Sequence, residues 1–364
     1  MKLLMFIPSM RGGGAERVMA VLCNGLSQRG HEVVLSTDLS EGIKYPLDSR
    51  IKLVALTERK YRKSLYGKIS YNFYFYRRIR KIIKEIRPDA VISFLYILNP
   101  KVILASRGLH IPVISSEHTN FKVKRTWLKT IRREYINKLA DRVTILTKAD
   151  FDYVGAKLKN KVIVPDPLPF LPPEKDCDRK KVILAVGYLN RYKEKGFDRL
   201  IETWSHIAHK YPDWKLCIAG TGNSESVNNL QQLCVRYKVD DRVQFPGFID
   251  DMQSFYQRAS IFVLPSQYEG FSMALIEAMS QGCAAVSLNC PSGPEEIISN
   301  WEDGILVGAD DFGALEENIS YLIEDENLRK KLSHNAIKNM QRYSVENIMN
   351  IWENLLREVV EKKA

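Results

Sequence analysis

The chain has 364 residues, of which 45% are hydrophobic, so it is long enough for two domains and is not a disordered protein. Its six cysteines form no C-x-x-C pair, which disfavours a disulfide framework and a cysteine metal site. No apolar run reaches the length of a membrane span and no signal-peptide core follows Met1, so we expect a cytoplasmic protein.

The net charge of +11 is divided very unevenly along the chain. Residues 1–164 hold 32 Lys and Arg against 13 Asp and Glu, a net charge of +19, whereas residues 165–364 have a net charge of −8. A strongly basic domain is expected to meet an anionic partner, which is nucleic acid, a membrane surface or a phosphorylated substrate.

Strand and helix patterns alternate from the N-terminus onward. Residues 2–7 predict a buried strand, and three glycines at 12–14 lead from it into a helix that ends near Arg29. Glycines before a helix N-terminus allow the backbone to approach a phosphate closely. Their spacing is not the G-x-G-x-x-G of dinucleotide-binding proteins. The alternation continues, which predicts an α/β protein with doubly wound parallel sheets.

Two basic segments of the first domain, residues 59–87 and 122–138, have aromatic residues among their cations. These residues are Tyr71, Phe73, Tyr74, Phe75 and Tyr76 in the first segment and Trp127 in the second. A helix of this kind can place its rings in a bilayer interface while its cations meet lipid phosphates. The alternative is an aromatic stripe that faces the core, with a basic face in water. The sequence leaves both open.

A histidine lies at the expected ligand-binding edge of the first sheet. Residues 89–94 and 112–116 predict strands, and the second is followed by Glu117-His118-Thr119-Asn120. Because ligands bind in the loops after the carboxyl ends of parallel strands, His118 is a candidate site residue.

The Pro-rich stretch 165–173 is the expected linker between two domains. The first domain is expected to span residues 1–164 and the second residues 165–344. The last helix, 345–364, is expected to pack back on the first domain.

The second domain opens with a predicted strand at 181–187, and the loop after it carries Arg191 and Lys195. A guanidinium fork and an ammonium group on such a loop suit a diphosphate. A glycine turn after the next strand, at Gly220, would bring the backbone close to a nucleotide.

The fourth strand of this domain, predicted at 261–264, leads through Gly270 into a helix at 273–281. Glu269 then lies on the loop and Glu277 inside the helix, so two carboxylates can accept hydroxyl hydrogen bonds at two places along one ligand.

The N-terminus of this helix is a candidate anion site. Ser272 is the expected N-cap, and the backbone N–H groups from Phe271 to Ala274 point their positive end toward an anion.

The segments Glu269-Gly-Phe-Ser and Glu277-Ala-Met-Ser-Gln-Gly resemble the Glu-x7-Glu signature of retaining glycosyltransferases of family 4 (GT4). The loop Gly12-Gly-Gly-Ala-Glu-Arg17 is similar to the glycine loop that opens many members of that family. The resemblance covers nearly the whole chain. It implies the GT-B fold, in which two Rossmann-like doubly wound parallel-sheet domains face each other across a cleft.

By this resemblance, Glu269 and His118 bind hydroxyls of the transferred sugar, while Arg191 and Lys195 stabilise the leaving diphosphate. Glu277 holds the ribose of the donor. The expected donor-binding residues are Gly13, Gly14, Gly220, Gly247, Gly270, Phe271, Ser272, Met273 and Glu277. The expected acceptor-binding residues are Glu16 and Arg17. Many members have Asn at the position of Asp166, so Asp166 is given no role.

The resemblance implies a retaining transferase that moves a hexose or N-acetylhexosamine from a nucleotide-diphosphate sugar, expected to be UDP-linked, to a lipid-linked glycan. We expect no cofactor and no obligatory metal, since no Asp-x-Asp motif sits at a strand end. The basic first domain is expected to attach the protein to the anionic inner face of the cell membrane. No nucleic acid is expected as a partner, and the oligomeric state is left open.

Two other functions compete with this one. A sugar-nucleotide epimerase can share the fold, but it would need additional acid and base residues. A nucleic-acid-binding protein would use the basic domain, but the sequence contains no recognised nucleic-acid-binding motif.

Overall fold

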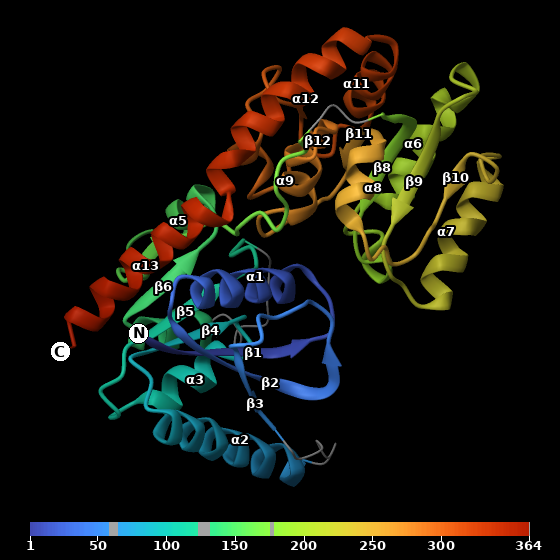
Figure 1. The fold of residues 1–364 in the computed structure, drawn as a ribbon. Coiled ribbons are helices and arrows are strands. Elements are labelled where there is room, and N and C mark those ends of the chain that lie inside the picture. The colour runs from blue at the N-terminus through green and yellow to red at the C-terminus, as the bar shows by residue number, and fades with distance from the viewer. Residues whose placement is uncertain (58–64, 123–131, 175–177, 364) are drawn as a thin grey trace. The chain divides into compact units, whose positions relative to one another are not determined.

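Two parallel sheets, each in a unit of its own, form the framework of the protein (Figure 1). The structure is a computed structural model that describes residues 1–57, 65–122, 132–174 and 178–363. At positions 41, 65–71, 132 and 134 it describes the backbone alone. The first unit is Met1–Pro169 with Val345–Ala364, and the second unit is Phe170–Ser344.

The sheet of the first unit has seven described strands in the order β3-β2-β1-β4-β5-β6-β7, and all neighbours are parallel. The strands are β1 (Lys2–Met10), β2 (Glu32–Ile43), β3 (Lys52–Ala55), β4 (Ala90–Phe94), β5 (Val113–Glu117), β6 (Arg142–Ile145) and β7 (Lys161–Ile163). The helices are α1 (Gly14–Gln28), α2 (Leu65–Ile86), α3 (Asn99–Ser106), α5 (Lys148–Val154) and α13 (Val345–Glu361), with a short π-helix at Arg132–Ile136. The strand order reverses between β1 and β4.

The sheet of the second unit has the order β10-β9-β8-β11-β12-β13, again parallel throughout. Its strands are β8 (Lys180–Val186), β9 (Lys215–Ala219), β10 (Val243–Gln244), β11 (Ala259–Leu264), β12 (Ala284–Leu288) and β13 (Ile305–Val307). Its helices are α6 (Phe197–Ile207), α7 (Ser224–Arg236), α8 (Met252–Arg258), α9 (Met273–Ser280), α10 (Pro294–Ile297), α11 (Phe312–Glu324) and α12 (Glu326–Met340). The order reverses between β8 and β11. Both sheets are therefore doubly wound, as the strand–helix alternation predicts.

The C-terminal helix α13 packs against α1 of the first unit. A Cβ on Gly25 of α1 would lie 2.7 Å from Sδ of Met349, so glycine allows the two helices to approach closely. Glu353 accepts hydrogen bonds from Arg29 at 2.9 Å and pairs with His31 at 3.0 Å. The His31 contact and the Arg29 guanidinium lower the pKa of Glu353. These contacts hold the C-terminal helix α13 against the N-terminal part of the first unit.

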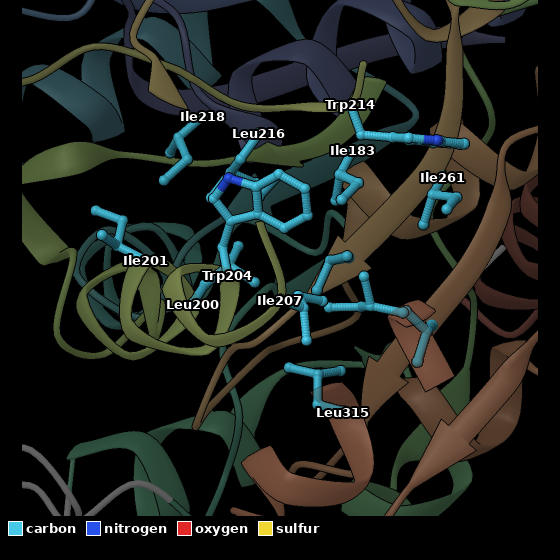
Figure 2. Packing of buried hydrophobic residues seen from close by; sticks show 14 of the residues in the cluster. Ile183, Leu200, Ile201, Trp204, Ile207, Trp214, Leu216, Ile218, Ile261 and Leu315 are labelled. Carbon is cyan, nitrogen blue, oxygen red and sulfur yellow. The ribbon is translucent and has the colours of Figure 1, made fainter. Parts of the chain in front are cut away.

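Alternate residues of the strands bury opposite faces of the second sheet. Ile261 and Val263 join a core that centres on Trp204 of α6, whose indole lies among Ile183 and Leu216 (Figure 2). On the other face, the ring of Phe262 meets the ring of Tyr256 of α8, with centroids 6.2 Å apart. The central strands are thus covered on both sides, as a parallel sheet requires.

Candidate active site

The candidate site of the second unit lies where its strand order reverses, between β8 and β11. Loops after the carboxyl ends of β8 and β11 meet there, and ligands of open α/β sheets bind at such a switch point. Lys195, on the first loop, donates a hydrogen bond to Oε1 of Glu269 on the second at 2.8 Å. Their side chains are 19% and 9% exposed, so the pair is largely withdrawn from water. The structure therefore joins two residues that the sequence places in one site.

The backbone of these two loops is also joined. The N–H of Gln267 donates to the carbonyl of Glu194 at 2.9 Å. Gly196 has φ +69°, and a Cβ at this position would overlap the carbonyl oxygen of Pro265. Only glycine tolerates this positive φ and leaves room for the Pro265 carbonyl. The close approach of the two loops therefore depends on glycine at position 196.

Arg191 lies on the same loop, but its side chain points elsewhere. Its guanidinium pairs with the carboxylate of Glu194, and both side chains are about half exposed. The structure does not bring the Arg191 side chain to Glu269 or Lys195, and its expected role toward a diphosphate stays a prediction.

The turn into α9 has the form expected of a binding loop. The helix begins at Met273 and its N-cap is Ser272, as predicted, but the Ser272 side chain makes no capping hydrogen bond. Ser272 has φ +73°, a left-handed conformation that costs a non-glycine residue on the order of 1 kcal/mol. Phe271, just before it, is buried with its ring edge-on to Tyr343, 5.2 Å between centroids.

Three buried hydroxyls on the loops after β11 and β12 lack a hydrogen-bond partner among the described residues. They belong to Ser266, Ser272 and Ser292. Gly293 brings these loops together, since a Cβ there would lie 2.8 Å from the carbonyl oxygen of Phe271. An unmatched buried hydroxyl is costly, and a polar ligand would supply the missing bonds.

Glu277 lies on α9, buried, and accepts a hydrogen bond from Oη of Tyr256 at 3.0 Å. Tyr256 is fully buried on α8. This tyrosine fixes one carboxylate oxygen of Glu277, and sequence reasoning missed it because nothing in its local pattern pairs α8 with α9.

Three glycines line the strand ends that precede these loops. The N–H of Gly220 donates to the carbonyl of Gly247 at 2.9 Å, and that of Gly187 to the carbonyl of Ala219 at 3.0 Å. A Cβ on Gly220, at φ +144°, would overlap the carbonyl oxygen of Gly187. The turns after β8, β9 and β10 are therefore held together by backbone contacts.

Cys290, after β12, shares the surroundings of the Lys195–Glu269 pair. Burial, with a further contribution from the Glu269 carboxylate, raises the pKa of its thiol to about 12, although Lys195 acts in the opposite sense. The thiol therefore stays protonated at neutral pH and is a packing group here.

In the first unit, the glycine loop leads directly into α1. Gly13 is the N-cap of α1 and Gly14 its first residue. The Glu16 carboxylate folds back over Gly13, where a Cβ would lie 2.5 Å from its Oε2. Burial raises the pKa of Glu16, while its backbone hydrogen bond and the nearby His118 act to lower the pKa. Glu16 and His118 therefore lie close enough to interact electrostatically.

Arg17 is the other residue expected to bind the acceptor. Its guanidinium carbon lies 5.2 Å from the centroid of the Tyr45 ring, and the Tyr45 hydroxyl donates to the carbonyl of Gly13 at 3.3 Å. Tyr45 therefore connects Arg17 to the glycine loop.

His118 follows β5 and is held from both sides. Its Nε2 lies 3.0 Å from Oγ of Ser116, which accepts a hydrogen bond from Thr144 at 2.7 Å. Its Nδ1 lies 3.2 Å from Oδ1 of Asp166, within ion-pair distance but without hydrogen-bond geometry. Because Ser116 accepts from Thr144, its own proton is available for Nε2, which favours the tautomer with the proton on Nδ1.

The ring of His118 also stacks on Phe94 at the end of β4, with centroids 4.1 Å apart. Asp166, which sequence reasoning set aside, is buried and faces His118 directly. Its position between Pro165 and Pro167 is the signal that a buried, rigidly held carboxylate was possible there.

A second pair that sequence reasoning missed lies beside His118. Arg133 donates from Nε to Oε2 of Glu117 at 2.8 Å, and the two side chains are 3% and 0% exposed. Arg133 belongs to the basic segment 122–138. Its charge is buried and paired, so this cation of the segment does not face water.

The basic segment 59–87 forms α2 from Leu65 onward, and its contact with a membrane stays a prediction. Phe75 lies in the core, whereas Phe73 is 61% exposed beside the guanidinium of Arg77. Residues 58–64 and Trp127 lie outside the part of the chain that the structure describes, as does the Tyr71 side chain. No described helix is long and apolar enough to cross a bilayer.

Both units match families of glycosyltransferases. Residues 12–165 match the family described as "Glycosyltransferase Family 4", and residues 172–339 match "Glycosyl transferases group 1". An uncharacterized glycosyltransferase of Haemophilus influenzae is 30% identical over 94% of this chain and 96% of its own.

The names of two further relatives state an activity or a biosynthetic process. A Campylobacter jejuni protein named as an alpha-1,4-N-acetyl-D-galactosaminyltransferase acting on a diNAcBac-PP-undecaprenol glycan is 28% identical over 99% of each chain. The amylovoran biosynthesis glycosyltransferase AmsD of Erwinia amylovora is 28% identical over 98% of this chain and 99% of its own.

Solved structures share the fold. Sucrose-phosphate synthase from Thermosynechococcus elongatus has a TM-score of 0.83 at 18% identity, covering 99% of each chain. HepE of Anabaena, in complex with UDP, has a TM-score of 0.77 at 17% identity, covering 98% of this chain and 99% of its own.

Proposed function

This chain belongs to the GT4-like glycosyltransferases of GT-B fold, and from that membership we propose that it is a retaining hexosyltransferase that uses a UDP-linked sugar. It acts in polysaccharide and glycan biosynthesis, the process to which its named relatives belong. The acceptor under this proposal is a lipid-linked glycan.

The hydrogen bond between Lys195 and Glu269 is the observation that supports this proposal best. In a sugar nucleotide the anomeric carbon is bonded to the distal phosphate. A group that holds sugar hydroxyls and a group that neutralises the diphosphate must therefore lie within one sugar ring of each other. The contact of 2.8 Å at the switch point of the second sheet meets this requirement.

The reaction needs stabilisation of the charge that develops on the departing nucleoside diphosphate. Lys195 supplies a positive charge, and the N-terminus of α9 after Gly270 supplies backbone N–H groups. Arg191 can add a second cation if its exposed contact with Glu194 opens. In this proposal these groups suffice without a cofactor or an obligatory metal.

The carboxylate of Glu277 is proposed to bind the nucleotide part of the donor. Glu277 is proposed to accept hydrogen bonds from the ribose, and Tyr256 fixes its orientation. The backbone at Gly220 and Gly247 is proposed to lie against the nucleotide, where a side chain would obstruct it.

Galactose and N-acetylgalactosamine are the proposed sugars. The segments Ser116-Glu-His-Thr-Asn120 and Cys290-Pro-Ser-Gly-Pro-Glu-Glu-Ile-Ile298 resemble those of transferases that use these donors. The Campylobacter jejuni relative is named for N-acetylgalactosamine, and HepE was solved with UDP.

The first unit is proposed to receive the acceptor and to meet the membrane. Glu16 and Arg17 lie at the start of α1, where hydroxyls of an acceptor glycan would find a carboxylate and a guanidinium. An acceptor whose lipid tail stays in the bilayer requires a protein at the membrane surface. The exposed Phe73 and Arg77 of α2 suit that surface.

A panel of donors tests the proposal. Release of nucleoside diphosphate is measured with UDP-galactose, UDP-N-acetylgalactosamine, UDP-glucose, UDP-N-acetylglucosamine and GDP-mannose, and a Glu269→Ala protein purified in parallel controls for contaminating hydrolases. We expect release from a UDP-sugar that the Glu269→Ala protein lacks. Release from GDP-mannose alone would overturn the choice of UDP, and no release from any donor, with or without a lipid-linked acceptor, would overturn the enzyme assignment.

A further inference from the structure

The loop that carries His118 is built around a buried ion pair. Taking two charges out of water costs several kcal/mol for each, so a pair such as Arg133–Glu117 persists only with good geometry and further hydrogen bonds. The pair is not required by the sheet itself, because Glu117 is the last residue of β5 and Arg133 comes from the π-helix. It therefore stabilises the residues that directly follow β5, up to Asn120.

Each nitrogen of the Arg133 guanidinium has an acceptor. Nε donates to Glu117 at 2.8 Å, Nη1 donates to the carbonyl of Asn120 at 3.1 Å, and Nη2 donates to the carbonyl of Thr119. One guanidinium thus bonds the residue before His118 and the two residues after it. Its plane also lies over the Phe121 ring, 3.4 Å from the centroid.

Both carboxylate oxygens of Glu117 also accept hydrogen bonds. Its Oε1 accepts from the side-chain amide of Asn137 at 3.0 Å and from that of Asn99 at 3.3 Å, while Oε2 takes the bond from Arg133. Asn99 and Asn137 are both buried, so the carboxylate is fixed to α3 and to the turn after the π-helix. A lysine at position 133 would keep the charge but has no planar fork to reach three acceptors.

From these contacts we infer that Arg133 and Glu117 form a clamp that positions His118 for the sugar-transfer reaction, an inference that rests on the proposed function. Both side chains are buried against protein groups, so we assign them as positioning residues. The clamp sets the backbone at His118, and Ser116 and Asp166 then set the ring. A displacement of about 1 Å in such a group can cost a hundredfold in rate.

The test compares Arg133→Lys with Arg142→Lys, which alters another Glu-paired arginine of the first unit away from His118. Five quantities are measured on each folded variant: the melting midpoint, kcat and KM for the preferred UDP-sugar, the Kd for UDP, and the His118 ring signal in a histidine-labelled NMR spectrum. The His118→Ala protein identifies that signal. Glu117→Gln provides a second variant that keeps the shape of the side chain.

We expect Arg133→Lys and Glu117→Gln to shift the His118 signal and to lower kcat about tenfold or more. KM and UDP affinity should stay within about twofold, and Arg142→Lys should leave the signal and kcat unchanged. A folded Arg133→Lys protein with wild-type kcat and signal would overturn the clamp. So would a loss of activity that only follows the unfolded fraction while the signal stays in place.

The two proposals fail separately. If the wild-type protein uses no sugar nucleotide, the proposed function is wrong, and the NMR signal alone still decides whether the pair positions His118.

Discussion

Lys195 donates a hydrogen bond to Glu269 at 2.8 Å, although the two residues are 74 positions apart in the chain. They meet because β8 and β11 are neighbours at the point where the strand order of the second sheet reverses. The Gln267–Glu194 backbone bond and the contact of Gly196 with Pro265 hold their two loops together. A cation and a carboxylate are thereby paired at the place where the topology predicts a ligand.

Removal of the Lys195 ammonium group should weaken diphosphate binding. We expect Lys195→Ala to raise the Kd for UDP by about 10- to 100-fold, because a hydrogen bond to a charged group contributes about 1.5–3 kcal/mol. Calorimetry measures this change. Lys193→Ala, an exposed lysine of the same loop, is the matched control and should bind UDP normally. Unchanged affinity in Lys195→Ala would remove Lys195 from the site.

Tyr256→Phe deletes a hydroxyl that donates to Glu277 and leaves the ring in its aromatic contact with Phe262. Without this hydrogen bond the carboxylate is less well oriented toward the ribose, so we expect the Kd for UDP to rise about 3- to 10-fold. The melting midpoint serves as the control for packing. A variant with wild-type affinity would show that Tyr256 does not orient Glu277 for binding.

The thiol of Cys290 should be inert in the folded protein. Its pKa of about 12 lies above the ordinary value of 9.0, so the reactive thiolate is scarcer in the folded than in the unfolded chain at pH 8. We expect iodoacetamide to label Cys290 about a thousandfold more slowly in buffer than in urea, as followed by mass spectrometry of its peptide. Comparable rates in both solvents would contradict the buried position beside Glu269.

The first unit should bind anionic membranes reversibly. Each cation near an anionic leaflet contributes about 1 kcal/mol, and the attraction is screened beyond roughly 10 Å at 0.1 M salt. We therefore expect the protein to sediment with phosphatidylserine liposomes at low salt, less at high salt, and little with neutral liposomes. Equal binding to both lipids, or none to either, would contradict the prediction.

Charge reversal on α2 localises that surface. Arg77→Glu with Lys81→Glu changes two exposed cations of α2, whereas Lys331→Glu with Lys338→Glu makes the same charge change on α12 of the second unit. Only the first pair should lower liposome binding. If both pairs lower it equally, the attraction depends on net charge and not on α2.

The sequence was sufficient for the features that depend on local pattern. Alternating apolar strands and helices predicted both doubly wound sheets, and the helix predicted at 273–281 agrees with α9 to within a residue. The resemblance to family 4 placed Lys195 and Glu269 on loops that the structure joins.

Partners that lie far apart in the chain were beyond such reasoning. Tyr256 with Glu277, and Asp166 with His118, are pairs whose members carry no local signal of each other. Arg133 shows the same limit most clearly, because a cation in a basic run reads as exposed, yet tertiary packing buries it against Glu117. Composition predicts how much charge a segment has, whereas the fold decides which charges face water.

The central claim is the division of labour between the two carboxylates of the second unit, and one paired measurement tests it. For Glu269→Ala and Glu277→Ala, kcat with the preferred UDP-sugar and the Kd for UDP are determined on the same preparations. We predict that Glu269→Ala lowers kcat about a hundredfold or more with a Kd within about twofold of wild type. Glu277→Ala should instead raise the Kd about tenfold. Equal effects of both substitutions on UDP affinity, or wild-type turnover in Glu269→Ala, would contradict the account.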